Sequence, residues 1–159
     1  MSELAHNDNS LRQSEWSATG NARGGELLVD TGEVCRGDQG IKANALGSCV
    51  AVTAFDPESG VAGMAHVMLP GISPDQDPSK RTRYAQDAID EMLRKSTELG
   101  ADVAKLQVCL VGGVNVLGEG HVSPGPGIVD SVTDILGKMG ISPVASDVGG
   151  EQRRSVRLD

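Results

Sequence analysis

A cysteine and a histidine stand out because each lies on its own short apolar run, and the two runs are close in the chain. Cys49 follows Gly47, and His66 lies within residues 64–68 (MAHVM). Residues 56–60 (DPESG) between the runs are turn formers, so the runs are predicted to be neighbouring strands. Pairing these strands would bring the thiol beside the imidazole. A thiol next to an imidazole is a nucleophile that works near neutral pH.

The backbone before the cysteine adds a second part of such a site. Gly47 lies two residues before Cys49, where a glycine lets the chain turn sharply and leaves room for a substrate. The amides of Ser48 and Cys49 could then donate to a developing oxyanion, and each such donor lowers the barrier by about 3 kcal/mol. The alternative is that Cys49 is a buried apolar filler and His66 an ordinary core or surface histidine.

The remaining cysteines and histidines do not predict a metal site. Cys49, His66 and His121 lack the closely spaced ligand pairs that a zinc site requires, so we expect no metal and no other cofactor. Cys109 lies in an apolar run and is predicted to fill the core, whereas Cys35 lies near a loop. Three cysteines without a close pair favour free thiols and a cytoplasmic protein.

Composition narrows the class of protein. A chain of 159 residues is long enough for one domain with its own core. The formal net charge of -8 repels nucleic acid and anionic membranes, and no basic stripe interrupts it. No apolar run approaches the length of a bilayer span, and the N-terminus has no signal segment. We therefore expect neither nucleic-acid binding nor membrane insertion.

Hydrophobic periodicity gives the order of the elements. Residues 1–24 are polar and predict a mobile N-terminal arm, which leaves residues 25–159 as a single catalytic domain. Amphipathic stripes predict two helices, which end at Gly100 and Gly140. The helices are expected at 81–99 and 128–139. Strands are expected at 26–29, around Cys49 and His66, at 106–111, at 141–145 and, as an edge strand, at 153–158. Turns or loops are expected at 37–42, 70–80, 118–127 and 147–150. This order predicts an α+β or mixed α/β fold with two amphipathic helices covering a mixed β-sheet.

Several of these segments together resemble the chemoreceptor glutamine deamidase family (CheD). The resemblance rests on residues 46–49 (LGSC), Asp56-Pro57 and 63–70 (GMAHVMLP), and it continues through 83–85 (RYA), 112–115 (GGVN) and 147–150 (DVGG). It covers about residues 26–158 and implies a three-layer sandwich. It also implies a cytoplasmic protein-glutamine glutaminase, which converts glutamine side chains of methyl-accepting chemotaxis receptors to glutamate and releases ammonia. A chemotaxis phosphatase of the CheC type is the further partner that the resemblance implies.

The resemblance implies Cys49 and His66 as the catalytic pair, and one departure from the family bears on it. The family has a threonine six residues before its cysteine, where this chain has Ala43, followed by Asn44. The Ala43 carbonyl could orient the imidazole, or the Asn44 side chain could replace the threonine. In a third interpretation the site is weak, and the chain is a non-enzymatic adaptor for the phosphatase.

Three further points stay open in the sequence. The same thiol could hydrolyse a receptor methyl ester, because that carbonyl is a similar electrophile. A redox sensor built on Cys49 is another interpretation, although no resolving cysteine lies nearby in the chain. The loops at 70–80 and 118–127 are the candidates for the surface that meets a receptor helix.

Overall fold

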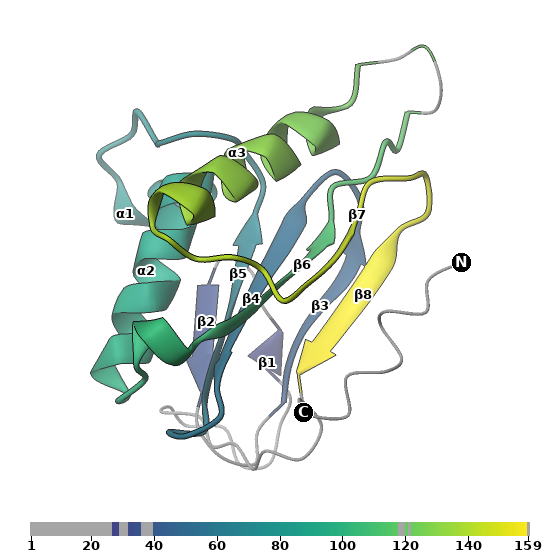
Figure 1. The fold of residues 1–159 in the computed structure, drawn as a ribbon. Coiled ribbons are helices and arrows are strands. Elements are labelled where there is room, and N and C mark those ends of the chain that lie inside the picture. The colour runs from purple at the N-terminus through teal and green to yellow at the C-terminus, as the bar shows by residue number, and fades with distance from the viewer. Residues whose placement is uncertain (1–26, 29–31, 36–39, 118–119, 121, 159) are drawn as a thin grey trace.

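The described part of the chain folds into two β-sheets and two long helices, arranged in three layers (Figure 1). The computed structural model describes residues 27–28, 32–35, 40–117, 120 and 122–158. A five-stranded sheet lies between the helices and a three-stranded sheet. The predicted α+β class and the sandwich are confirmed, while the second sheet is an addition to the one mixed sheet expected. The predicted arm over residues 1–24 lies outside the described residues.

The five-stranded sheet contains the central strand of the molecule, β4. Its order is β2-β5-β4-β6-β7, with bounds Gly32–Cys35, Val61–Val67, Val50–Asp56, Gln107–Gly112 and Ala145–Val148. β4 pairs antiparallel with β5 and β6, whereas β6 and β7 are parallel, so the sheet is mixed. Every residue of β4 is buried, because side chains on both of its faces enter a core. That explains why its sequence is nearly continuously apolar rather than alternating.

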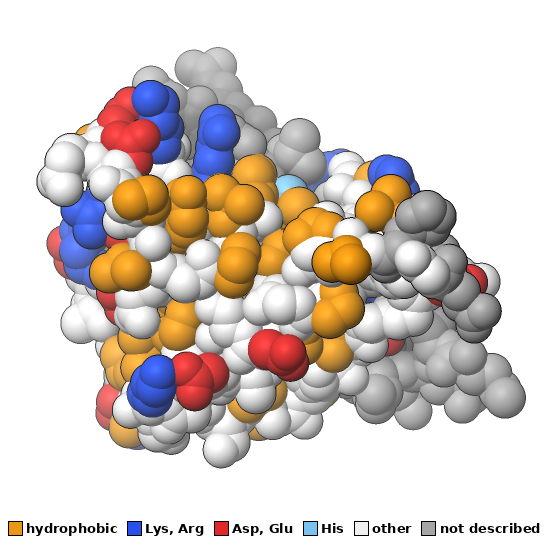
Figure 2. Space-filling model, turned by 90° about the horizontal axis from the view of Figure 1, so that it is seen from above, with side chains coloured by type: hydrophobic (Ala, Val, Ile, Leu, Met, Phe, Trp, Pro, Cys, Tyr) orange, Lys and Arg blue, Asp and Glu red, His pale blue; other side chains and the backbone are white. Residues whose placement is uncertain are grey.

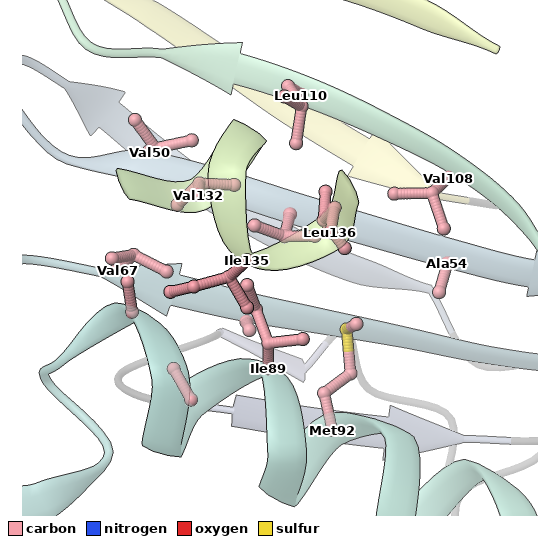
Figure 3. Packing of buried hydrophobic residues seen from close by; sticks show 14 of the residues in the cluster. Val50, Ala54, Val67, Ile89, Met92, Val108, Leu110, Val132, Ile135 and Leu136 are labelled. Carbon is pink, nitrogen blue, oxygen red and sulfur yellow. The ribbon is translucent and has the colours of Figure 1, made fainter. Parts of the chain in front are cut away.

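Helices α2 (Ala85–Glu98) and α3 (Pro124–Lys138) cover one face of this sheet (Figure 1). Each helix buries the apolar stripe that predicted it. Figure 3 shows Ile89 and Met92 of α2 lying with Leu136 of α3 over the strands of the sheet. This core is aliphatic, as a chain with one tryptophan, one tyrosine and one phenylalanine requires.

The opposite face of the sheet packs on the second sheet, whose order is β1-β3-β8. Its strands are Leu27–Leu28, Ile41–Leu46 and Arg154–Leu158. β3 and β8 are antiparallel, and they face β4 and β5 across a second apolar cluster. The buried members of this cluster are Ile41, Ala43, Leu46, Ala51, Phe55, Ala62, Met64 and Leu158. The central sheet therefore has an apolar core on each face.

The predicted helices are confirmed with shifted starts. α2 begins at Ala85 rather than at residue 81, because a separate short helix, α1 (Pro78–Arg81), precedes it. α3 begins at Pro124, inside the segment expected to be a loop. The Ser123 hydroxyl caps its first turn by accepting a hydrogen bond from the Gly125 amide (3.4 Å).

Two strand predictions are wrong in place. β3 begins at Ile41, inside the segment 37–42 that was expected to turn. β7 covers Ala145–Val148 instead of 141–145, because it is residues 145–148 that pair with β6. Both strands are short and only partly buried, so their pairing partners decide their position more than their own sequences do. The predicted edge strand at 153–158 is confirmed by β8, which lies at the end of its sheet.

The turn between β4 and β5 is held by a buried carboxylate. Asp56, only 1% exposed, accepts hydrogen bonds from the Glu58 amide (2.9 Å), the Ser59 hydroxyl (2.8 Å) and the Asp102 amide (2.9 Å). Burial alone would raise the pKa of the Asp56 carboxyl, but the hydrogen bonds outweigh burial and hold that pKa below its ordinary value. The turn thereby fixes the pairing of the two strands that lead to Cys49 and His66.

Candidate active site

Cys49 lies directly before β4, at one end of the sandwich, rather than inside a strand as predicted. Its side chain is partly exposed and packs against the apolar cluster between the two sheets. Ala51, two residues later, belongs to the same cluster. Cys49 therefore lies on the sheet face away from the helices, at a level that solvent reaches.

His66 lies near the end of β5 and on the same face as Cys49. The antiparallel ladder places His66 opposite Ala51, and residues opposite each other in such a ladder share a face. Cys49 lies two residues before Ala51 and one residue before the ladder begins at Val50, so Cys49 and His66 lie at the same end of the hairpin. The structure thus brings the predicted pair to one end of one sheet face.

The histidine reaches the molecular surface. His66 is partly exposed, and it is the one histidine among the described residues. Figure 2 shows a histidine at the surface beside hydrophobic side chains, on the face seen from above. His66 is therefore a partly exposed residue beside apolar side chains.

The segment 47–49 is held by hydrogen bonds to its carbonyl groups. The Gly113 amide donates to the Cys49 carbonyl (2.8 Å), and the Val114 amide donates to the Gly47 carbonyl (2.9 Å). Within the described residues, no backbone carbonyl accepts a hydrogen bond from the amide of Ser48 or Cys49. These amides are the predicted oxyanion donors, and they are not used up by backbone pairing in the described part of the chain.

The Gly112-Gly113 corner fits closely around Cys49. Gly112 has φ 113°, and a Cβ there would lie 2.3 Å from the Cys49 carbonyl oxygen. Gly113 has φ 62°, and a Cβ there would lie 2.3 Å from Cγ2 of Val129 in α3. Both positions need glycine for conformation and for space. The GGVN motif is thus a backbone corner that supports the cysteine, and not a phosphate-binding loop.

Position 43, where the resemblance implies the family's threonine, lies beside an irregularity in β3. β8 pairs with Ala43 through Val156 and with Leu46 through Arg154, so β3 carries one extra residue between these pairs. Ala45 in this bulge has φ 53°, and its amide donates to the Ser155 hydroxyl (3.1 Å).

The two candidate orienting residues differ in exposure. The Ala43 side chain is 1% exposed and lies in the same apolar cluster that Cys49 packs against. Asn44 is exposed. The structure therefore places position 43, rather than the Asn44 side chain, on the interior side with the cysteine.

Burial controls the protonation of the cysteine. It raises the pKa of the Cys49 thiol above its ordinary value, and contact with the residue's own backbone amide offsets only part of that rise. The free thiol is therefore the resting form at neutral pH. A reaction of Cys49 as nucleophile needs a base that removes its proton.

Exposed apolar side chains flank this end of the molecule. Leu69, two residues beyond β5, is 38% exposed, and Ile72 is 66% exposed. Val116 lies beside the cysteine segment, because its Cγ1 is 3.0 Å from where a Cβ on Gly47 would lie. Figure 2 shows such hydrophobic side chains gathered over the face seen from above. Two loops, 70–80 and 118–127, were expected to meet a receptor helix. In the second loop, residues 118, 119 and 121 lie outside the described residues.

Sequence reasoning used Asp147 only as part of the DVGG segment and gave neither Asp147 nor Arg154 a role in this region. Arg154 in β8 forms an ion pair with Asp147 in β7 (2.9 Å) and donates to the Gly149 carbonyl (2.7 Å). The DVGG segment predicted a turn, but it did not indicate what the Asp147 side chain contacts. A contact between side chains on strands of two different sheets leaves no periodic pattern, so this pairing could not be found in advance.

Cys109 in β6 is a buried core residue, as predicted, and 9% of the residue is exposed. Among the described residues, no three His, Cys, Asp or Glu side chains gather where they could hold a metal ion. None of the helices in the described ranges combines the length and the apolar character needed to cross a bilayer.

Comparison with known proteins identifies the family. Residues 68–159 match the family model described as CheD chemotactic sensory transduction. A probable chemoreceptor glutamine deamidase CheD from Chlorobium luteolum is 35% identical over 135 residues, which cover 84% of this chain and 67% of that protein. Chemoreceptor glutamine deamidase CheD from Thermotoga maritima is 37% identical over 114 residues, 72% of this chain and 71% of the relative.

A further relative matches over most of both chains. Probable chemoreceptor glutamine deamidase CheD 1 from Methanosarcina acetivorans is 30% identical over 137 residues, which cover 85% of this chain and 86% of that protein. The resemblance noted from Cys49, His66 and their flanking segments is therefore confirmed at the level of the family. The chain belongs to the CheD family.

Proposed function

We propose that this chain is a protein-glutamine glutaminase that deamidates glutamine side chains of chemotaxis receptors in the cytoplasm. The relatives named above carry that activity in their names. The observation that supports the proposal for this chain is the register of β4 and β5, which sets His66 opposite Ala51, two residues after the partly exposed Cys49. A thiol and an imidazole in this relation suit attack on a carboxamide.

In the first half of the reaction, His66 takes the proton of the Cys49 thiol. A base is needed because burial raises the pKa of the Cys49 thiol, so a thiolate does not form unaided at neutral pH. The sulfur then bonds to the carboxamide carbon of the substrate glutamine, and the amides of Ser48 and Cys49 stabilise the oxyanion. The imidazolium gives its proton to the leaving nitrogen, the C–N bond breaks, and ammonia departs.

In the second half, water hydrolyses the thioester. His66 removes a proton from the water, the new C–O bond forms, and the C–S bond breaks. The proton returns to the sulfur, which leaves a glutamate side chain and the starting thiol. No cofactor takes part in this sequence. The product carries one more negative charge on a receptor helix, which can shift a receptor between signalling states.

We assign the role of orienting the imidazole to the backbone of Ala43. The Ala43 side chain lies in the apolar cluster beside Cys49, whereas Asn44 is exposed. Replacing Ala43 by threonine should keep or raise kcat, because a hydroxyl at this position adds a second group that can hold the ring. A large fall in kcat for Ala43→Thr would contradict this assignment.

The test of the proposed function is a deamidation assay with a receptor cytoplasmic domain. The purified chain should add about 1 Da to the receptor for each glutamine converted, as the amide becomes an acid. Cys49→Ala should give no product, while Cys109→Ala serves as the matched control because Cys109 is a core residue of β6. Equal product from wild type and Cys49→Ala would contradict the mechanism. A methyl-esterified receptor in the same assay tests whether methanol is also released.

The alternative function is a non-enzymatic adaptor for a CheC-type phosphatase, favoured by alanine at the position of the family's threonine. An adaptor should bind the phosphatase tightly and leave the mass of the receptor domain unchanged. If the chain both binds the phosphatase and deamidates the receptor domain, the phosphatase is a partner of the enzyme. Both results come from one set of samples, so the two functions are distinguishable.

A further inference from the structure

We propose that Arg154 is a positioning residue for the Cys49 nucleophile. It acts through two pieces of backbone, the turn at 147–150 and the Gly112-Gly113 corner. The inference rests on the proposed thiol chemistry of Cys49, but it concerns the geometry of the thiol, which can be measured without a substrate. Together Arg154, the turn and the corner are called the Arg154 brace below.

The first link of the brace joins Arg154 to the turn. Its guanidinium donates from Nη1 to the Gly149 carbonyl (2.7 Å) and to the Gln152 carbonyl (3.3 Å). Nη2 lies 2.9 Å from Oδ1 of Asp147, and each side chain of this ion pair is about one-fifth exposed. Gly149 and Gly150 have φ 78° and 73°, a conformation that other residues adopt only with strain. One planar cation therefore holds a turn that has little stability of its own.

The second link joins the turn to the corner. The Gly149 amide donates to the Gly112 carbonyl (2.9 Å), and the Asn115 amide donates to the Gly150 carbonyl (2.8 Å). The turn is thus hydrogen-bonded to both ends of residues 112–115. Parallel pairing of β6 with β7, which includes Gly112 with Val148, keeps the two segments in register.

The third link joins the corner to the nucleophile. The Gly113 amide donates to the carbonyl of Cys49 itself (2.8 Å), and the Val114 amide donates to the Gly47 carbonyl (2.9 Å). Gly112 approaches the Cys49 carbonyl so closely that a Cβ would overlap it. A shift of the corner therefore shifts the peptide that carries the sulfur and the proposed oxyanion donors.

The chemistry of arginine fits this role better than that of lysine. A guanidinium presents several N–H donors in one plane, so it can hold a carboxylate and two carbonyls together, whereas an ammonium is a point charge on a flexible stem. Displacement of reacting groups by about 1 Å costs on the order of a hundredfold in rate. Loss of the brace should therefore appear in kcat more than in KM.

The kinetic test compares Arg154→Gln with Arg153→Gln, which changes a neighbouring exposed arginine and so makes the same change in net charge. With a receptor domain as substrate, Arg154→Gln should lower kcat by about tenfold to a hundredfold with KM within about twofold of wild type. The kcat of Arg154→Lys should lie between those of wild type and Arg154→Gln, and the kcat of Arg153→Gln should match wild type. An unchanged kcat in Arg154→Gln overturns the proposal.

The second test measures the thiol directly by peptide-resolved alkylation with iodoacetamide at pH 8. Without the brace the segment 47–49 loosens, so Cys49 should react about threefold faster or more, because burial no longer protects the sulfur. Cys109 in the core should keep its rate. A slower kcat with a faster-reacting Cys49 is a pair of changes that supports positioning.

General unfolding is a distinct outcome of the same samples. If Cys49 and Cys109 speed up together in Arg154→Gln, the arginine serves overall stability and the proposal is overturned. The milder Asp147→Asn keeps an oxygen acceptor and provides a folded comparison in which kcat should fall less. If the wild-type chain deamidates nothing, the proposed function fails, and the alkylation of Cys49 in wild type and Arg154→Gln still decides the role of Arg154.

Discussion

At the residue scale, the environment of Cys49 favours a protonated thiol, which needs a base before it can react as a nucleophile. Burial raises the pKa of the Cys49 thiol, so the neutral form dominates at neutral pH. Many thiol enzymes instead hold a preformed thiolate, in which the pKa of the cysteine is lowered by neighbouring positive charge. The position of this residue at a partly exposed, apolar end of the sheet favours proton removal during the attack itself.

This difference predicts the pH dependence of Cys49 alkylation in the absence of substrate. The rate should rise about tenfold per pH unit between pH 6 and pH 8.5, because the thiolate fraction follows pH well below a raised pKa. Peptide mass spectrometry after timed reaction with iodoacetamide gives the rate for Cys49 alone. A plateau that begins below pH 7 would mean that a thiolate–imidazolium pair already exists.

A second residue-scale prediction concerns Ala45. Its φ of 53° lies in the left-handed region, which costs a residue with a Cβ about 1 to 2 kcal/mol. Ala45→Gly should therefore stabilise the fold by roughly 0.5 to 1 kcal/mol, after the extra freedom of glycine in the unfolded chain is subtracted. Urea denaturation measures the change. Asn44→Gly, at a neighbouring residue without positive φ, is the control and should destabilise.

The sequence predicts that Cys49 and His66 lie near each other, because the signal for their pairing is local. Two apolar runs joined by a turn of five residues must pair as a hairpin, and the pairing brings one end of each run together. Arg154 is different, because it contacts Asp147 in the other sheet and its remaining partners are backbone carbonyls. A carbonyl has no signature in sequence, so only the folded chain shows what Arg154 holds.

The hairpin of β4 and β5 is the element that sets the register of the candidate pair. Its turn encloses the Asp56 carboxylate, which three groups within the described residues satisfy. The sequence predicts the turn from its Asp-Pro and Gly residues, but it does not predict the hydrogen bond from the distant Asp102 amide. Such a bond depends on how the chain after α2 returns to the sheet.

Asp56→Asn should destabilise the fold by about 2 kcal/mol at pH 7, because the asparagine presents an NH2 group to donors that need an acceptor. The folded-state pKa of Asp56 is below its ordinary value, so the carboxylate stabilises the fold above that ordinary value. This stability is lost as pH falls through the lowered pKa. The gap between wild type and variant should therefore narrow below about pH 4.

The matched control for this prediction is Asp134→Asn, which changes an exposed carboxylate on α3 that pairs with Lys138. Exposed pairs of this kind contribute at most about 0.5 kcal/mol. Chemical denaturation of the three proteins at pH 7 and at pH 3.5 gives the comparison. A gap that stays constant between these two pH values would show that the Asp56 charge is not what stabilises the turn.

Element boundaries set by local patterns are predicted, whereas boundaries set by long-range pairing are not. α2 and α3 are predicted because their stripes repeat every three or four residues and glycines follow them. β3 is misplaced because the expected turn was extended to Lys42, although residues 41–44 already alternate between apolar and polar side chains. Its position is fixed by pairing with β8 at the far end of the chain, which periodicity does not report.

On the scale of the whole molecule, the fold class is predictable and the layering is not. Helices and strands in this order indicate α+β layers, and the described residues show them. The separate sheet of β1, β3 and β8 combines strands from both ends of the chain. No local pattern distinguishes such an arrangement from one larger sheet.

The burial of β4 on both faces determines how slowly its amide protons exchange with solvent. Amide protons of Val52 and Ala54 should exchange with deuterium only when the entire structure opens, since neither core can detach while the strand stays in place. Amides in the outer strand β8 should exchange much earlier, and NMR-detected exchange would show the gradient. Cys49 immediately precedes β4, so the backbone that follows the thiol stays fixed until the whole structure opens.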